Sequence, residues 1–367
     1  MEVTLTKDRN KGIDALRVVS MFMIVVMHIL KQGGILETLA AQKNMQSYVA
    51  WLLEVIAFCS VNCYALISGY VGIQSKFKAS RLLKLWLKVL FYSLSITVIF
   101  SVFYPGSVNQ HMWIKAIFPI MSRQYWYVTC YFGLMIFMPI LNEGLKNLEM
   151  KRFTWMIRAS ILFFSVLPCV LQGYPFNFVS GLDAFGSLNG YSVLWLLIMY
   201  LLGAYLRFSD SLRKIKNWML ILGLIFSVII TWGSIFLLPV WTLKRFGEVR
   251  YTTILLSYTS PTILLMSTCL LLLFTRWNMQ NKVVGKGMSM AGIATLGVYL
   301  IHTNPLIWER LLKGFAVGYA IEPTIIMVGK IIVSAALIYL ICTLLDIIRE
   351  MIFEGIFMLS KKILRKN

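Results

Sequence analysis

Long apolar runs constrain this chain more than any other feature. They are roughly 17–25 residues long, the length that a helix needs to cross about 30 Å of hydrocarbon. A helix satisfies its backbone polar groups internally, so it can lie in lipid. The composition agrees, since 59% of the 367 residues are hydrophobic, 14% are charged and the mean hydropathy is +0.76. We therefore expect an all-α membrane protein.

The apolar runs predict about ten membrane-spanning helices. Their ranges are 15–31, 48–72, 83–104, 124–141, 157–172, 191–208, 217–238, 253–275, 293–309 and 324–347. The loops between them are too short to bury a core, so residues 1–367 are expected to form one membrane domain. The first run resembles a signal peptide but has no small-residue cleavage pattern after His28, which favours a retained helix.

The distribution of basic residues predicts the orientation, because short cytoplasmic loops are enriched in Lys and Arg. With the N-terminus inside, 25 of the 35 lie in the tails and even-numbered loops, nine in the odd-numbered loops, and Lys330 within the last span. We therefore expect both tails, 1–14 and 348–367, to be cytoplasmic. The net charge of +20 borders the apolar runs and forms no nucleic-acid-binding module, so we expect it to bind membrane lipids and no nucleic acid.

Ionisable residues inside the apolar runs are candidates for function, because a charge at the centre of a span costs about 2.5–3.5 kcal/mol. The first run offers Asp14, Arg17 and His28. Arg17 and His28 are eleven residues apart. That is about three helical turns, so both project from one helix face, about 16 Å apart along the axis. Asp14 can pair with Arg17 three residues later.

Histidines are scarce, and two of the three, His28 and His302, lie in predicted spans at similar depth. An imidazole titrates near neutral pH, so it can accept a hydroxyl proton and later return it. Either ring could instead only bond a neighbouring helix. The six cysteines lie in apolar segments without metal-ligand or redox spacing, so no metal site is expected.

Polar and aromatic residues of the second and fourth runs could extend a site. Asn62, Ser68 and Tyr70 lie in the second run, and Trp126 and Tyr127 start the fourth. Aromatic rings at the end of a span usually form an interfacial belt, but they can also stack on sugar rings. The amide and the hydroxyl could bind a substrate or another helix. The second run also contains Glu54, which could orient a histidine, although its spacing does not require it.

Several of these segments, in order along the chain, resemble the family 3 integral-membrane acyltransferases. They are Gly12-Ile13-Asp14-Ala15-Leu16-Arg17 followed by ten residues and His28, Asn62-Cys63-Tyr64-Ala65-Leu66-Ile67-Ser68-Gly69-Tyr70, Arg81-Leu82-Leu83-Lys84, Tyr125-Trp126-Tyr127 leading to Pro139-Ile140-Leu141-Asn142, and Gly297-Val298-Tyr299-Leu300-Ile301-His302. The resemblance covers nearly the whole chain. Lys84 and Lys88 stand where members often carry Arg, and a lysine does not bind phosphate bidentately.

The resemblance implies an enzyme of the bacterial cytoplasmic membrane that O-acylates surface glycans. An acyl group, most commonly acetyl, would pass from a cytoplasmic coenzyme A thioester to a hydroxyl of an extracytoplasmic polysaccharide or glycolipid, with no resident cofactor. His28 would be the base or the acyl carrier, with Arg17, Asp14 and His302 completing the catalytic set. Donor phosphates would be bound by Arg17, Arg81 and Lys84. The acceptor would contact Asn62, Ser68, Tyr70, Trp126, Tyr127 and Tyr299. The alternative is a non-enzymatic exporter of glycan or lipid.

Overall fold

The protein is a bundle of helices. The computed structural model describes residues 10–75, 78–173, 185–249, 253–277 and 282–364, and these ranges contain no strand. Eight of the described helical segments are long and apolar enough to cross a membrane, and two shorter apolar helices, Val193–Phe208 and Pro261–Thr275, lie where further spans are predicted. The all-α, multi-pass fold is therefore confirmed, whereas the total of ten spans and the cytoplasmic termini stay predictions.

The long helices follow the apolar runs, and short helices lie in the connections. In chain order they are α1 (Lys11–Lys31), α2 (Ile35–Thr38), α3 (Met45–Phe58), α4 (Ser60–Gly72), α5 (Ala79–Phe103), α6 (Gln110–Ile117), α7 (Trp126–Lys146), α8 (Met150–Ile161), the π-helix η1 (Leu162–Val166), α9 (Leu167–Gly173), η3 (Leu188–Gly190), α10 (Val193–Phe208), α11 (Asp210–Arg213), α12 (Asn217–Phe246), α13 (Pro261–Thr275), α14 (Lys282–His302), α15 (Pro305–Ile307), the π-helix η4 (Trp308–Leu312), η5 (Val317–Tyr319) and α16 (Thr324–Leu364).

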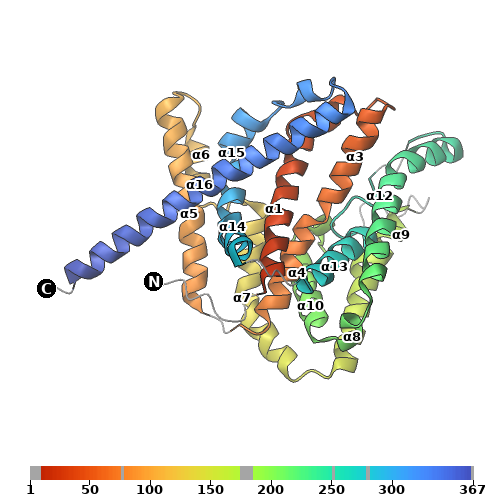
Figure 1. The fold of residues 1–367 in the computed structure, drawn as a ribbon, viewed down its shortest axis with the longest axis horizontal. Helices are drawn as coiled ribbons and strands as arrows, with labels where there is room; N and C mark the ends of the chain where they lie inside the picture. The colour runs from red at the N-terminus through yellow and green to blue at the C-terminus, as the bar shows by residue number, and fades with distance from the viewer. Residues whose placement is uncertain (1–9, 76–77, 174–184, 250–252, 278–281, 365–367) are drawn as a thin grey trace.

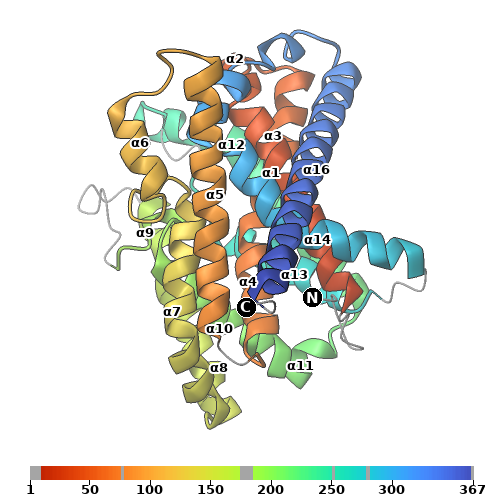
Figure 2. The same ribbon diagram turned by 90° about the vertical axis from the view of Figure 1, so that its left-hand side faces the viewer.

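Helix α1 lies in the interior of the bundle (Figure 1). Its first turn is capped by Asn10, whose side-chain oxygen accepts a hydrogen bond from the backbone N–H of Ile13. The helix then packs against α3, α4, α13, α14 and α16. The polar side chains of α1 therefore project among other helices rather than into lipid. In Figure 2 the start of α1 and the end of α16 lie toward the same end of the bundle.

The second predicted span, 48–72, is divided into two helices. α3 and α4 meet at Cys59, whose backbone N–H bonds to the carbonyl oxygen of Ala57. That bond is shorter in sequence than the four-residue spacing of an α-helix, so the ladder breaks there. The break separates Glu54 on α3 from the polar residues of α4.

Two glycines bring α4 and α10 into backbone contact. A Cβ atom on Gly69 would lie 1.9 Å from the carbonyl oxygen of Tyr200, and one on Gly203 would lie 2.2 Å from that of Leu66. Neither atom could be accommodated without separating the helices. Small residues are the usual means of such close approach in membranes, where lipid provides no hydrophobic drive between helices.

The ninth span was predicted at 293–309, but the helix in that region ends earlier. α14 ends at His302, because the Asn304-Pro305 step that follows favours an extended residue before the proline. The Asn304 side chain then accepts a hydrogen bond from the N–H of Leu306 and caps the short helix α15. His302 is thus the last residue of a helix, not the middle of a span.

Two further boundaries differ from the predictions. The eighth span, predicted from residue 253, begins as a helix only at Pro261, which occupies a first-turn position where its missing N–H is not needed. The C-terminal tail, predicted from residue 348, continues α16 to Leu364, because no proline interrupts a segment in which apolar residues continue. Residues 1–9 and 365–367 of the predicted tails lie outside the described residues.

A buried charge cluster fastens α16 to α5. Asp346 accepts hydrogen bonds from Lys88 Nζ at 2.9 Å, from the Tyr92 hydroxyl at 2.6 Å and from Arg349 Nε at 3.0 Å. Charged groups within a membrane bundle normally pair with one another in this way. Lys88 therefore forms an ion pair between helices.

Candidate active site

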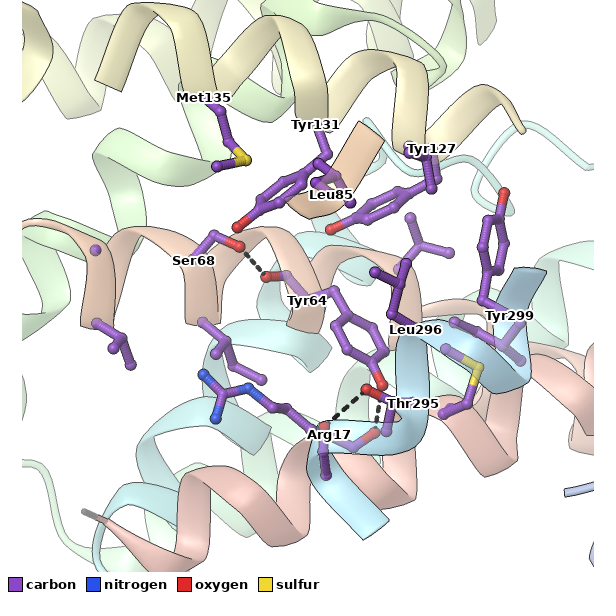
Figure 3. A pocket seen from close by; sticks show the side chains of 18 of the residues that line it. Arg17, Tyr64, Ser68, Leu85, Tyr127, Tyr131, Met135, Thr295, Leu296 and Tyr299 are labelled. Atoms are coloured by element: carbon purple, nitrogen blue, oxygen red, sulfur yellow. Dashed lines mark hydrogen bonds between the residues drawn. The ribbon is translucent and has the colours of Figure 1, made fainter. Parts of the chain in front are cut away.

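A cavity of about 520 Å³ opens beside α1 and is called the arginine cavity here, because Arg17 and Arg81 are among its lining residues. Among the described residues that line it there is no carboxylate. Side chains from α1, α4, α5, α7 and α14 contribute to its wall (Figure 3). The lining residues include Arg17, Ser68, Arg81, Tyr127 and Tyr299. Its cationic end and apolar length suit a ligand with an anionic head and a flexible arm.

Arg17 is held in place by two neighbouring helices. Its Nη1 lies 2.7 Å from Oδ1 of the fully buried Asp14, and the other carboxylate oxygen of Asp14 accepts a hydrogen bond from Ser289 Oγ at 2.9 Å. The Tyr64 hydroxyl donates to the backbone carbonyl of Arg17 at 2.6 Å. The predicted pairing of Asp14 with Arg17 is present, and the Arg17 side chain remains 25% exposed.

The basic start of α5 contributes one of its two predicted donor residues. Arg81 lines the arginine cavity, whereas Lys84 is exposed and is absent from the cavity wall. The two residues are three positions apart, yet Leu85 rather than Lys84 follows Arg81 on the inward face.

A second cavity, of about 360 Å³, is called the glutamate cavity here, because Glu54 and Glu309 line it. Its wall also contains Lys31 and two glutamines, Gln32 and Gln124. Most of the rest is aromatic: Phe58, Trp126, Tyr191, Tyr258, Tyr299 and Trp308. Amide and carboxyl groups between aromatic faces can bind a ligand that is itself part polar and part apolar.

His28 lies where the two cavities meet. It lines both of them, together with Met27, Trp126, Tyr258 and Tyr299. The Trp308 ring packs edge-on against the imidazole, with 4.7 Å between ring centroids. Trp308 begins the π-helix η4, and π-helical turns are frequent at functional sites. One imidazole can therefore contact ligands in both cavities.

A chain of hydrogen bonds determines which nitrogen of His28 is free. His302 Nδ1 lies 2.6 Å from the carbonyl oxygen of Val298, which can only accept, so this nitrogen carries the proton. In the neutral ring His302 Nε2 is then an acceptor, and His28 Nδ1, 2.9 Å away, donates to it. His28 Nε2 is left unprotonated and is available as a base or a nucleophile.

The structure brings together most, but not all, of the predicted site residues. Ser68, Trp126, Tyr127 and Tyr299 line one or both cavities. His302, which was predicted to belong to the catalytic set, lines neither cavity, because it is 1% exposed and lies behind His28. The residues predicted to bind a ligand that lie outside both cavities are Asn62, Tyr70 and Lys84.

Asn62 and Tyr70 have other partners. The Asn62 amide donates to the carbonyl oxygen of Tyr258 at 2.8 Å and accepts from Trp195 Nε1 at 3.1 Å, so it joins three segments of the bundle. The Tyr70 ring faces the guanidinium of Arg207 at 5.1 Å. Both therefore have interhelical contacts, which is the usual fate of polar residues in membrane helices.

Many residues of the two cavity walls are not among the predicted site residues, and five polar or aromatic ones show why. Gln32, Tyr191, Tyr258 and Trp308 lie at helix ends or in connections, where periodicity carries no signal. The fifth, Glu54, did carry a signal, since it is an acidic residue inside an apolar run.

Comparison with known proteins identifies a family for the sequence. The sequence matches the family 3 acyltransferase domain over residues 10–345, nearly the whole chain. No curated protein and no solved structure matches it. The matched region contains every residue that lines either cavity.

Proposed function

Because the chain belongs to the family 3 acyltransferases, we propose that it transfers an acyl group, most commonly acetyl, from a coenzyme A thioester to a hydroxyl of an extracytoplasmic saccharide. Acyl transfer itself follows from the family. We propose the identity of the donor and of the acceptor, and the location of the protein in the bacterial cytoplasmic membrane. The observation that carries it is that His28 lines two chemically different cavities.

The arginine cavity suits the donor. The coenzyme A arm between phosphate and sulfur contains about twelve bonds, as many as about four extended residues, so it reaches roughly 14 Å. The axial rise between Arg17 and His28 is about 16 Å, and both line the cavity. Phosphate at Arg17 and Arg81 would therefore place the thioester beside His28. Arginine suits this task because its planar guanidinium can bind phosphate bidentately.

The glutamate cavity suits the acceptor. Sugars present apolar ring faces and hydroxyl edges, and this wall offers aromatic rings together with amide and carboxyl groups. The shared residues Trp126 and Tyr299 would border both substrates. The acceptor hydroxyl would then approach His28 from the side opposite the thioester.

The chemistry needs one basic nitrogen, and His28 Nε2 is free. In the direct route, Nε2 takes the hydroxyl proton while the oxygen attacks the thioester carbonyl. The C–S bond breaks, and the thiolate recovers the proton from the imidazolium. In the alternative route, Nε2 itself attacks the carbonyl, and the C–S bond breaks with release of the thiolate. The hydroxyl oxygen then attacks the acyl-imidazolium, the C–N bond breaks, and the freed Nε2 passes the hydroxyl proton to the thiolate. In both routes His28 Nδ1 keeps its proton and its bond to His302, which stabilises the transient positive charge.

The test compares surface glycan from cells with and without the gene by mass spectrometry. The expected result is an ester present only when the protein is made, and lost again when His28 is replaced by Ala. A glycan that is equally acylated in both cells contradicts the proposal. If cells with the gene carry unmodified glycan on their surface and cells without the gene carry none there, the result supports the exporter instead.

A further inference from the structure

Glu54 is a buried acidic residue with an unfilled hydrogen-bonding capacity. It lies on α3, is 3% exposed and lines the glutamate cavity. Its Oε2 has no hydrogen-bond partner among the residues that the structure describes. A buried carboxyl oxygen without a partner is costly, so it is normally satisfied by something that the protein itself does not provide.

The other polar residues of this cavity are already engaged or exposed. Glu309 is exposed and pairs with Lys313 at 2.9 Å. The Gln32 side-chain amide donates to the backbone carbonyl of Trp308 at 3.2 Å. Glu54 therefore differs from its neighbours, because it combines burial with an unused oxygen in a cavity wall.

The surroundings of Glu54 indicate what could occupy the space. Phe58 lies on α3, as Glu54 does, and the Tyr258 ring stacks against it with 4.6 Å between ring centroids. The Tyr258 ring also stacks against Trp126, with 5.9 Å between centroids. An aromatic enclosure with a carboxyl group can bind a cation or a neutral hydroxylated ring. Lys31 in the same wall disfavours a cation, so a neutral saccharide fits better.

We propose that Glu54 binds the acceptor, by a hydrogen bond between its carboxyl group and a saccharide hydroxyl. This inference rests on the proposed function. His28 lines the same cavity, so a sugar held at Glu54 presents another part of its edge to His28 Nε2. Glu54 is thus an acceptor-binding residue, and its contribution lies in the use of the glycan rather than of the donor.

The experiment uses the full-length protein in detergent, radiolabelled acetyl coenzyme A, and glycan prepared from cells that lack the gene. Glu54→Met removes the carboxyl group at similar length, and Glu54→Ala removes it with the side chain. Glu54→Gln keeps a group that can bond a hydroxyl. The control is Glu37→Gln on α2, an exposed glutamate outside both cavities. Binding of acetyl coenzyme A to each variant shows that it is folded.

Glu54→Met and Glu54→Ala are expected to raise KM for the glycan roughly tenfold, with KM for acetyl coenzyme A unchanged. Glu54→Gln should recover part of the loss, and Glu37→Gln should behave as the unmodified protein does. Because Glu54 Oε2 has no hydrogen-bond partner among the described residues that its removal would leave unpaired, neither apolar variant should reduce the amount of folded protein.

Three results contradict the inference. The first is an unchanged KM for glycan in an apolar variant, and the second is an equal rise in both KM values. The third is loss of folded protein in both apolar variants, which would make Glu54 a structural residue. If the unmodified protein transfers no label to glycan at all, the proposed function itself fails, which is a different outcome.

Discussion

His28 Nδ1 lies 2.9 Å from His302 Nε2, although the two residues are separated by most of the chain. His302 in turn is fixed by the carbonyl oxygen of Val298 on its own helix. A backbone acceptor thus sets the tautomer of one ring, and that ring sets the tautomer of the other. The arrangement makes His302 a positioning residue for His28.

The first prediction concerns His302. Its replacement by Leu removes the acceptor for His28 Nδ1–H, so the free nitrogen is no longer specified. Loss of a residue that orients a metal-binding histidine typically lowers metal affinity or activity about 10–100-fold. By analogy we expect kcat to fall by roughly that factor, with both KM values unchanged. His302→Gln can accept the same hydrogen bond and should recover part of kcat. Equal losses in Leu and Gln variants would show that the residue only fills space.

The second prediction concerns His28 itself. Among the residues that the structure describes, His28 alone lines both cavities and has a free basic nitrogen, so kcat of His28→Ala should fall at least roughly 100-fold. The amount of protein in the membrane should be unchanged, measured by immunoblotting. The control is His111→Ala on α6, an exposed histidine outside both cavities. Near-normal transfer by His28→Ala would move attention to His302.

The third prediction concerns the two arginines. Arg81→Ala should raise KM for the coenzyme A thioester roughly tenfold, because a charge-assisted contact with phosphate is lost. Arg17→Lys should lose part of the donor affinity, since a point charge replaces a planar fork. Arg17→Ala should also reduce the amount of protein, because it removes the cation that pairs with Oδ1 of the buried Asp14.

Steady-state kinetics with each substrate varied in turn measures these effects. The control is Arg152→Ala on α8, whose side chain is 76% exposed and outside both cavities. If Arg81→Ala raises KM for the glycan and leaves that for the thioester unchanged, the arginine cavity is not the donor site.

The fourth prediction concerns the contact between α4 and α10. Gly69→Ala would place a methyl group 1.9 Å from the Tyr200 carbonyl oxygen. We therefore expect the free energy of unfolding to fall by about 3 kcal/mol or more, and the melting temperature to fall with it. Gly144→Ala on α7 is the control, since nothing lies within 4 Å of its added carbon, and an alanine there favours the helix. A Gly69→Ala protein as stable as Gly144→Ala would show that the two helices are not in backbone contact.

The fold could be predicted because lipid imposes length on helices. Arg17 and His28 were placed on one face by their spacing alone, and both line the same cavity. Helix ends were harder. The span predicted at 293–309 continued through Asn304-Pro305, so His302 was placed in mid-span, and its contact with His28 could not be anticipated.

The site could be predicted where one helix carries it and not where several meet. The sequence left open whether the Asn62 amide binds a substrate or another helix, and the structure shows a neighbouring carbonyl and an indole as its partners. Glu54 could not be assigned from the sequence, because the lack of a hydrogen-bond partner for its Oε2 among the described residues is visible only when the surrounding helices are in place. The roles of these residues stay predictions.

The wall that the two cavities share has a consequence for how the enzyme would work in a membrane. A carrier must alternate between two open states, rocking one half of its bundle against the other around a fixed site. Here two cavities meet at His28, so on the proposed function donor and acceptor would occupy separate cavities. The acyl group alone would then pass from one cavity to the other at His28, while neither coenzyme A nor sugar changes sides.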